Sequence, residues 1–167
     1  DKEGRVVLKR TWESESSPLS TYYVYDDYGN LSFVLTPKAE ADNGSINQST
    51  LDELCYQYRY DRRQRLIEKR VPGRGDWDEM VYNKLDQLVL SRDPNLKAQN
   101  KWLFSKYDGL GRVVMTGVTN SSTSRVQWQT DIDAQSTLWE TYVTNGGNGT
   151  YYTSNCLPAH TSVAQYY

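Results

Sequence analysis

Carboxylates that recur along the chain are the first residues to consider for chemistry. Asp26, Asp61 and Asp108 stand in similar local sequences, and a ladder of such carboxylates could bind a cation. Each of the three also follows a tyrosine at a point where a turn would begin. A turn gives the carboxylate a local hydrogen-bonding role with backbone N–H groups. The turn is therefore the favoured interpretation, and no metal site is predicted.

The other reactive residue types are few and isolated. His160 is the single histidine and has no motif partner, so it is interpreted as a loop or packing residue. Cys55 and Cys156 are too few and too far apart in sequence to predict a metal site; they could form one disulfide, but free thiols are favoured. Glycine-rich stretches at 73–75 and 146–149 lack the lysine and the Ser/Thr of a phosphate-binding loop and are read as turns. We expect no catalytic residue, no cofactor and no enzyme activity.

Aromatic side chains are the remaining candidates for ligand binding. The chain has 14 tyrosines and 5 tryptophans, and an exposed ring can stack on a sugar. Trp77 and Trp102 are the candidate glycan platform. The tyrosines recur beside the turns, where aromatic cross-strand pairs stabilise a sheet by roughly 0.2–1 kcal/mol each. Sheet packing is therefore the favoured role of the aromatic residues, and a carbohydrate-binding or adhesive module stays open as the alternative function.

Charge and hydropathy exclude two classes of partner. The net charge is −2, from 19 basic and 21 acidic residues that are interspersed, so no basic surface for nucleic acid is predicted. No apolar run is long enough for a membrane span. Aliphatic residues are sparse, but 13% of the residues are aromatic, which argues against a disordered chain.

The elements that must position these side chains follow from an internal repeat. Five acidic or amide residues, which we call anchors, align as equivalent positions of a loosely spaced repeat. A tyrosine directly precedes each of the last four anchors. The anchors are Asp1, Asp26, Asp61, Asn83 and Asp108. The tyrosines are Tyr25, Tyr60, Tyr82 and Tyr107. Three positions after each anchor stand Gly4, Gly29, Gln64, Asp86 and Gly111. Five positions after each anchor stand Val6, Leu31, Leu66, Leu88 and Val113.

Each copy of the repeat predicts a β-hairpin. The anchor opens the turn, and a glycine three residues later suits the left-handed residue that closes it. Apolar side chains alternate with polar ones on both sides, as Leu31, Phe33 and Leu35 show, so one face of each strand should be packed. The turn residues are predicted to be Asp26, Gly29, Asp61, Asn83, Asp108 and Gly111. The packed residues are predicted to be Tyr25, Leu31, Tyr60, Leu66, Tyr82, Leu88, Tyr107 and Val113. Gln64 tolerates a positive φ poorly, so the third turn is predicted to be distorted.

The repeat defines the predicted organisation of the chain. Residues 1–118 should form the hairpins, with a loop at 37–50 that is rich in Asn, Ser and Gly and is expected to be mobile. Residues 119–167 should form an irregular continuation, with a short helix near 124–135 and the start of a further repeat at the end. The first copy of the repeat is truncated, so we expect the chain to be a fragment of a larger protein. The predicted fold class is mainly all-β, built of antiparallel hairpins.

The repeated units resemble those of a known class of proteins. The stretches Tyr25–Leu31, Tyr60–Leu66 and Tyr107–Val113 are similar to the tyrosine/aspartate (YD) repeats of RHS proteins. The runs Leu51–Asp61 and Trp102–Asp108 are similar to the RHS proteins of the Bacteroidetes, many of which are exported by type IX secretion. The resemblance covers the chain from about Tyr22 to its end.

This resemblance implies an architecture and a function. In RHS and insecticidal-toxin-complex proteins, YD repeats form a β-strip that coils into a shell around a C-terminal toxin, and related repeats build the barrel of the teneurins. It implies that this chain is a non-enzymatic segment of the wall of such a shell, secreted or at the cell surface. The implied partners are neighbouring repeats of the same polypeptide, an enclosed toxin domain and the secretion machinery.

Overall fold

The computed structural model describes residues 1–15, 17–144, 151–159 and 162–166. The chain is mainly antiparallel β-structure with a few short helices, which confirms the predicted fold class. It divides into an N-terminal unit, Asp1–Asp78, and a C-terminal unit, Glu79–Tyr167. Within the C-terminal unit, Trp128 and Ile132 of the segment after residue 118 pack against the hairpins that precede them.

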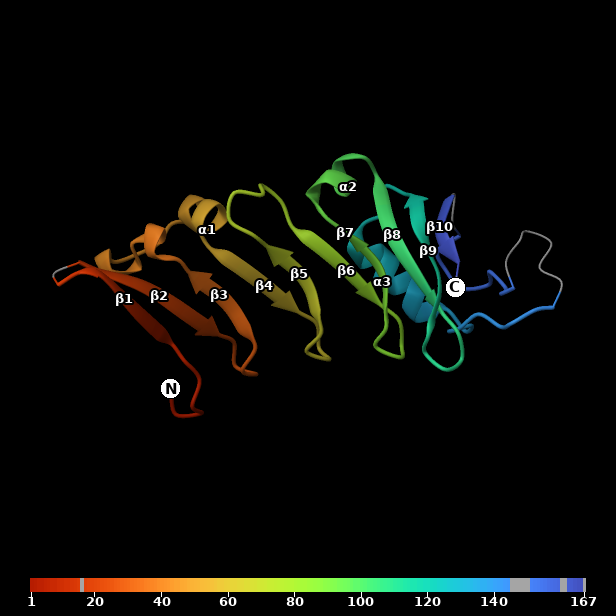
Figure 1. Cartoon of the computed structure of the whole chain (residues 1–167), viewed down its shortest axis with the longest axis horizontal. Coiled ribbons are helices and arrows are strands. Elements are labelled where there is room, and N and C mark those ends of the chain that lie inside the picture. The colour runs from red at the N-terminus through yellow and green to blue at the C-terminus, as the bar shows by residue number, and fades with distance from the viewer. Residues whose placement is uncertain (16, 145–150, 160–161, 167) are drawn as a thin grey trace. The chain divides into compact units, whose positions relative to one another are not determined.

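The N-terminal unit is a sheet whose strands are hydrogen-bonded in chain order (Figure 1). Each strand runs antiparallel to the one before it, and a bulge marks the register beside each turn. Among the described strands, the first pairs on one side only, with the second. The strands are β1 (Leu8–Ser14), β2 (Ser17–Tyr25), β3 (Leu31–Leu35), β4 (Tyr56–Tyr60) and β5 (Leu66–Arg70).

The predicted loop at 37–50 is partly helical. Two 3₁₀ turns, η1 (Pro37–Ala39) and η2 (Ala41–Asn43), are followed by helix α1 (Gln48–Leu54). The Asn47 side chain caps α1 by accepting a hydrogen bond from the N–H of Thr50 at 2.8 Å. The composition of this segment predicts turns only. It does not reveal that Asn47 caps a short helix.

The C-terminal unit continues with further hairpins and two helices (Figure 1). β6 to β9 are antiparallel neighbours in chain order, and the predicted terminal strand pairs with β9. The helix predicted near 124–135 is present as α3. The elements are β6 (Asp78–Tyr82), β7 (Leu88–Arg92), α2 (Pro94–Ala98), β8 (Lys101–Tyr107), β9 (Val113–Asn120), α3 (Arg125–Ala134) and β10 (Ser162–Tyr166).

The C-terminal unit has a hydrophobic core between its sheet and α3. Val81, Leu90 and Phe104 stand opposite one another on adjacent strands and therefore share one face. Ile132 of α3 is 1% exposed and belongs to the same cluster, and Trp128 packs against it. The buried members of the core are Val81, Val89, Leu90, Trp102, Phe104, Met115 and Ile132.

The positions predicted to be packed are less buried than expected. Six of the eight are half-buried, and Leu88 and Val113 are exposed, each by 37%. The next residues along the chain, Val89 and Val114, are buried instead. The buried position is thus shifted by one residue from the predicted one, next to the β-bulge in each hairpin. The half-buried positions are Tyr25, Leu31, Tyr60, Leu66, Tyr82 and Tyr107.

Candidate functional site: the repeated turn and the tyrosine clamp

The anchor residue of each repeat organises its turn through the same hydrogen bonds. One side-chain oxygen accepts from the backbone N–H groups two and four residues later; for Asp61 these are Arg63 at 2.8 Å and Arg65 at 3.0 Å. This oxygen therefore satisfies donors that the tight turn would otherwise leave unpaired. The five anchors with this pattern are Asp1, Asp26, Asp61, Asn83 and Asp108.

The second side-chain atom of the anchor contacts the residue that follows the turn. Asp61 and Asp108 each accept from the Nε of an arginine four residues later, both at 2.7 Å. Asn83 reverses the direction, because its amide donates to Oε1 of Gln87 at 2.7 Å. The side chain four residues after the anchor is therefore part of the turn.

The residue that closes each turn has a left-handed backbone in every copy. Gln64 has φ 60° and Asp86 has φ 62°, close to the values of 78° to 85° at the glycines of the other copies. The N–H of Gln64 donates to the carbonyl of Asp61 at 2.9 Å, as the N–H of Gly111 does to Asp108 at 3.0 Å. The third turn is therefore not distorted as predicted; it keeps the common geometry, and Gln64 carries the backbone strain.

Replacing Gln64 by glycine should stabilise the N-terminal unit by about 1 kcal/mol, because a residue with a Cβ is disfavoured at positive φ. Gly111→Ala provides the opposite change at φ 79° in the C-terminal unit and should be destabilising. Urea unfolding followed by circular dichroism measures both. A loss of stability in the Gln64→Gly variant would contradict the strain at this position.

Hydrogen bonding lowers the pKa of the anchor carboxylates. The side-chain amide of Asn30, with backbone N–H groups, holds the pKa of Asp26 below its ordinary value. Burial alone would raise the pKa of Asp61, but the hydrogen bonds from Arg65 and Arg63 outweigh it and lower the pKa. Burial would also raise the pKa of Asp108, but the hydrogen bonds from Arg112 and Leu110 outweigh this effect and lower the pKa.

Acid should therefore weaken the fold. A carboxyl group with a depressed pKa in the folded state contributes stability that is present above its unfolded pKa, 3.8 for aspartate. That contribution is lost as the pH falls through the lower folded value. Urea unfolding between about pH 5 and pH 2 should show a falling free energy of unfolding. The Asp61→Asn variant should show a shallower fall, and an unchanged acid slope in that variant would contradict the assignment.

Three of the repeat tyrosines connect their hairpin to the one before it. Their hydroxyl groups donate to the backbone carbonyl five positions after the preceding anchor. Tyr60 donates to Leu31 at 3.0 Å and Tyr107 to Leu88 at 2.8 Å. Tyr25 donates in the same way to Val6 at 3.1 Å. We call this contact the tyrosine clamp. The sequence pattern assigned these tyrosines to packing, and the signal it left unused was the presence of tyrosine rather than phenylalanine before each of the last four anchors.

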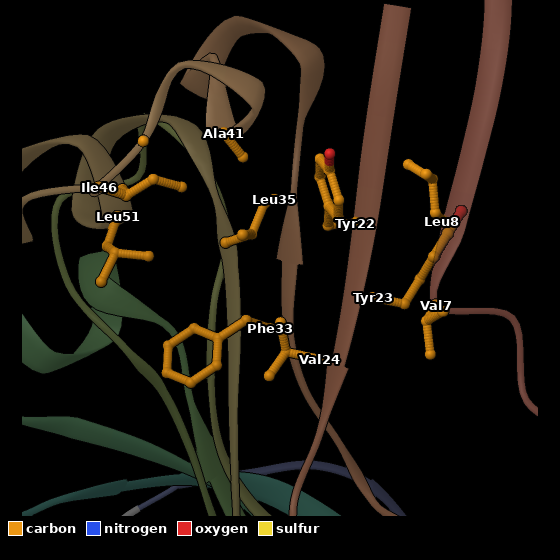
Figure 2. Close-up of a pocket in the computed structure, with 11 residues that line it drawn as sticks. Val7, Leu8, Tyr22, Tyr23, Val24, Phe33, Leu35, Ala41, Ile46 and Leu51 are labelled. Atoms are coloured by element: carbon orange, nitrogen blue, oxygen red, sulfur yellow. The ribbon is translucent and has the colours of Figure 1, made fainter. Parts of the chain in front are cut away.

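An apolar hollow of about 690 Å³ opens on the N-terminal unit (Figure 2). Val24 and Phe33 are paired across β2 and β3 at its floor, and they occupy the repeat positions of Val81 and Leu90. Those two residues of the C-terminal unit are covered by α3, whereas Val24 is 41% exposed. The lining residues are Val7, Leu8, Tyr22, Tyr23, Val24, Phe33, Leu35, Ala41, Gly44, Ile46 and Leu51.

The two tryptophans proposed as a glycan platform have other surroundings. Trp102 is fully buried in the core of the C-terminal unit, with the Arg92 guanidinium 4.0 Å from its ring centroid, so it offers no exposed face to a sugar. Trp77 is half-buried, and Arg59 covers its ring at 4.1 Å. The predicted platform is therefore wrong for Trp102. Its place in the core could not be read from the local sequence, because that core also includes Ile132 of the distant helix α3.

Other candidate groups are placed as follows. Cys55 and Cys156 are both free thiols, which agrees with the favoured interpretation. Within the described residues, no group of three or more His, Cys, Asp or Glu side chains is arranged to hold a metal ion. None of the described helices is long and apolar enough to cross a membrane. His160 and the 146–149 turn lie outside the described residues.

Comparison with family models and with curated proteins gives no match. No family model matches the chain, and no curated protein is significantly similar to it in sequence. The resemblance to YD repeats thus stays a prediction based on the repeat columns.

Proposed function

We propose that this chain is a non-enzymatic structural segment, part of the wall of a β-shell in a secreted RHS-type protein. The observation that supports this most is that the same set of turn and inter-hairpin hydrogen bonds is repeated along the chain. All five turns use the same anchor hydrogen bonds, and three of the tyrosines form the same clamp to the preceding hairpin. Residues repeated in this way indicate a structural role, because each copy closes its own hairpin and helps to join it to the neighbouring hairpin of a continuous sheet.

The mechanism of the wall is geometric. Each anchor closes its own hairpin, each clamp attaches that hairpin to its neighbour, and the natural twist of the strands curves the strip. β1 presents an unpaired edge in the described sheet, with Leu8 and Trp12 exposed. Such an edge is a template for a further strand, and in the proposed wall a neighbouring repeat occupies it.

The apolar hollow fits the same role. Leu8, Val24 and Phe33 present an uncovered apolar surface on the N-terminal unit, and the corresponding sheet positions of the C-terminal unit need a helix to bury them. A shell wall places one face of its sheet toward enclosed polypeptide. In this proposal, apolar side chains of the enclosed toxin or effector contact the hollow. They bury the apolar surface that the N-terminal unit leaves exposed.

Electron microscopy of the natural polypeptide that contains these residues tests the proposal. We expect closed shells with density inside. A second arm replaces residues 61–65 by the sequence of residues 108–112, which puts glycine where Gln64 stands. If the turns are interchangeable wall elements, shells of unchanged shape should form. Open ribbons or a small globule in the unaltered protein, or loss of shells after the exchange, would contradict the wall function.

An adhesive function is the second candidate, and one aromatic group favours it. Trp139, Tyr142 and Tyr151 are 48%, 59% and 61% exposed, and the two tyrosine rings stack with centroids 6.0 Å apart. Exposed rings of this kind suit stacking on sugars better than the buried Trp102 does. Binding on a glycan array that is lost in Trp139→Ala and retained in Trp12→Ala would favour adhesion over the wall.

A further inference from the structure

The last turn of the repeat differs from the other four at the residue directly after the anchor. The other copies have Lys2, Asp27, Arg62 and Lys84 at this position, whereas the last copy has Gly109. The φ of Gly109 lies outside the left-handed region, so the backbone of the turn does not require a glycine there. The glycine therefore serves to leave out a side chain that every other copy carries.

The indole ring of Trp139 lies beside the space that this glycine leaves open. A Cβ at position 109 would stand 3.5 Å from Cδ1 of the ring and 3.6 Å from its Nε1. A Cβ alone would fit at these distances, but the long side chains of the other copies would compete with a ligand for the space beside the ring. Trp139 is 48% exposed, so part of its surface remains open to solvent.

The turn and this ring line a pocket of about 270 Å³, which we call the turn pocket. Its volume is just below the range of about 300–1,000 Å³ that is typical of pockets for drug-sized ligands, so it suits one small ring. Tyr142 and Tyr152 form part of its lining, with centroids 5.7 Å apart and ring planes at 85°. The lining residues used below are Asp108, Gly109, Arg112, Trp139, Tyr142 and Tyr152.

Hydrogen bonds attach the aromatic side of the turn pocket to β8. The N–H of Glu140 donates to the carbonyl of Tyr107 at 2.7 Å, and the N–H of Thr153 donates to the carbonyl of Thr141 at 2.9 Å. The Glu140 side chain is fully buried, 3.4 Å from Nζ of Lys106, and accepts from the hydroxyl of Thr153 at 2.7 Å. The residues on either side of Glu140 are thus held in place before a ligand arrives, which lowers the entropic cost of binding.

Arg112 supplies hydrogen-bond donors to the turn pocket. Its Nε and one terminal nitrogen bind Oδ2 of Asp108 at 2.7 Å and 2.6 Å. These two contacts use two of the five N–H donors of the guanidinium and fix its plane. The Arg112 side chain is 67% exposed, so the remaining donors are accessible to a ligand.

The charges around the turn pocket cancel. Asp108 offsets Arg112, and Lys106 offsets Glu140. The Asp108 carboxylate also accepts from the backbone N–H groups of Leu110 and Arg112, both at 2.9 Å, so it has little capacity left for a cationic ligand. An anionic ligand would meet this carboxylate next to the guanidinium. The pocket therefore favours a neutral ligand with one apolar face and several oxygen acceptors.

We propose that the turn pocket binds one neutral sugar ring, a hexopyranose at the end of a glycan chain. The C–H face of the ring stacks on the indole of Trp139, and adjacent hydroxyl oxygens accept from the planar guanidinium of Arg112. This inference names the ligand class and the site of the adhesive function given above and rests on that function. It is independent of the wall function.

NMR titration of the whole chain tests the site. The indole N–H signal of Trp139 is assigned by its loss in Trp139→Phe. The probes are methyl β-glucoside, methyl β-galactoside and methyl α-mannoside. At least one of them should shift this signal, with a Kd on the order of 1–10 mM for a single ring in an open pocket. Glucuronic acid should bind no more tightly than the neutral sugars, and a tenfold tighter Kd for it would overturn the choice of a neutral ligand.

Variants copied from the other turns block the pocket while they keep a sequence that the repeat already uses. Gly109→Arg introduces the arginine of the third turn and should abolish the shift. Arg112→Asn copies Asn30, whose side chain donates to its own anchor at 3.0 Å, and should weaken binding by about tenfold or more. Asp27→Arg makes the matched change in the second turn and should leave binding unchanged. Circular dichroism checks that each variant is folded.

The outcomes separate this site from the adhesive function itself. Sugar binding that persists in both Gly109→Arg and Arg112→Asn would overturn the turn pocket and leave adhesion through other residues. The absence of a Trp139 shift with all three sugars would also overturn it, and a glycan array then shows whether adhesion fails as well. A Trp139 shift with a polyproline peptide and with none of the sugars would assign the pocket to a protein partner and overturn the sugar.

Discussion

Replacing Glu140 by alanine should lower the free energy of unfolding of the C-terminal unit by about 3–5 kcal/mol. The change leaves the Lys106 ammonium in a site with no solvent exposure and removes the acceptor of its ion pair. It also leaves the N–H groups of Asn155 and Cys156 without their carboxylate. Urea unfolding followed by tryptophan fluorescence measures the loss, since Trp102 and Trp128 report on this core.

Two variants separate the charge from the packing. Glu140→Gln keeps an acceptor oxygen and a similar volume, so it should cost less than alanine. Adding Lys106→Met to Glu140→Gln removes the unpaired charge and should recover part of the stability. A Glu140→Ala protein as stable as the wild type would show that the ion pair is not buried as described.

Replacing Asp61 by alanine should destabilise the N-terminal unit by about 2–4 kcal/mol. The carboxylate accepts from two backbone N–H groups of the turn and from the Arg65 guanidinium, and alanine removes all three of these hydrogen bonds.

Asparagine is the natural control for this position, because Asn83 forms the corresponding turn with the same two backbone contacts. Asp61→Asn should therefore cost only about 1 kcal/mol, the charge-assisted part of the interaction with Arg65. Equal losses in Asp61→Ala and Asp61→Asn would assign the effect to charge alone and contradict the role of the backbone bonds.

The hairpins were predictable because their determinants are local. The anchor, the left-handed position and the alternation of strand residues all lie within about ten residues, so the sequence columns carry them. One local prediction was wrong, that of a distorted third turn. It relied on the conformational preference of Gln64 alone, whereas the hydrogen bonds of the turn hold Gln64 at φ 60° against that preference.

Features that depend on distant segments were not predictable. The burial of Trp102 requires α3, which lies more than 20 residues later and has weak amphipathic periodicity. The contacts of Glu140 with Lys106 and Thr153 join three separate parts of the chain, and none of these residues belongs to a motif. The tyrosine clamp also escaped detection, because its acceptor is a backbone carbonyl that leaves no trace in residue identity.

That choice of acceptor has an evolutionary consequence. A tyrosine that bonds to a main-chain carbonyl makes no demand on the side chain of its neighbour, as the different residues Val6, Leu31 and Leu88 illustrate. The clamp itself thus imposes no pairwise sequence coupling between adjacent hairpins. As far as this contact is concerned, a copy can be duplicated, deleted or recombined without a compensating mutation at the acceptor position, so a gene for such a strip can change length while the clamp is kept.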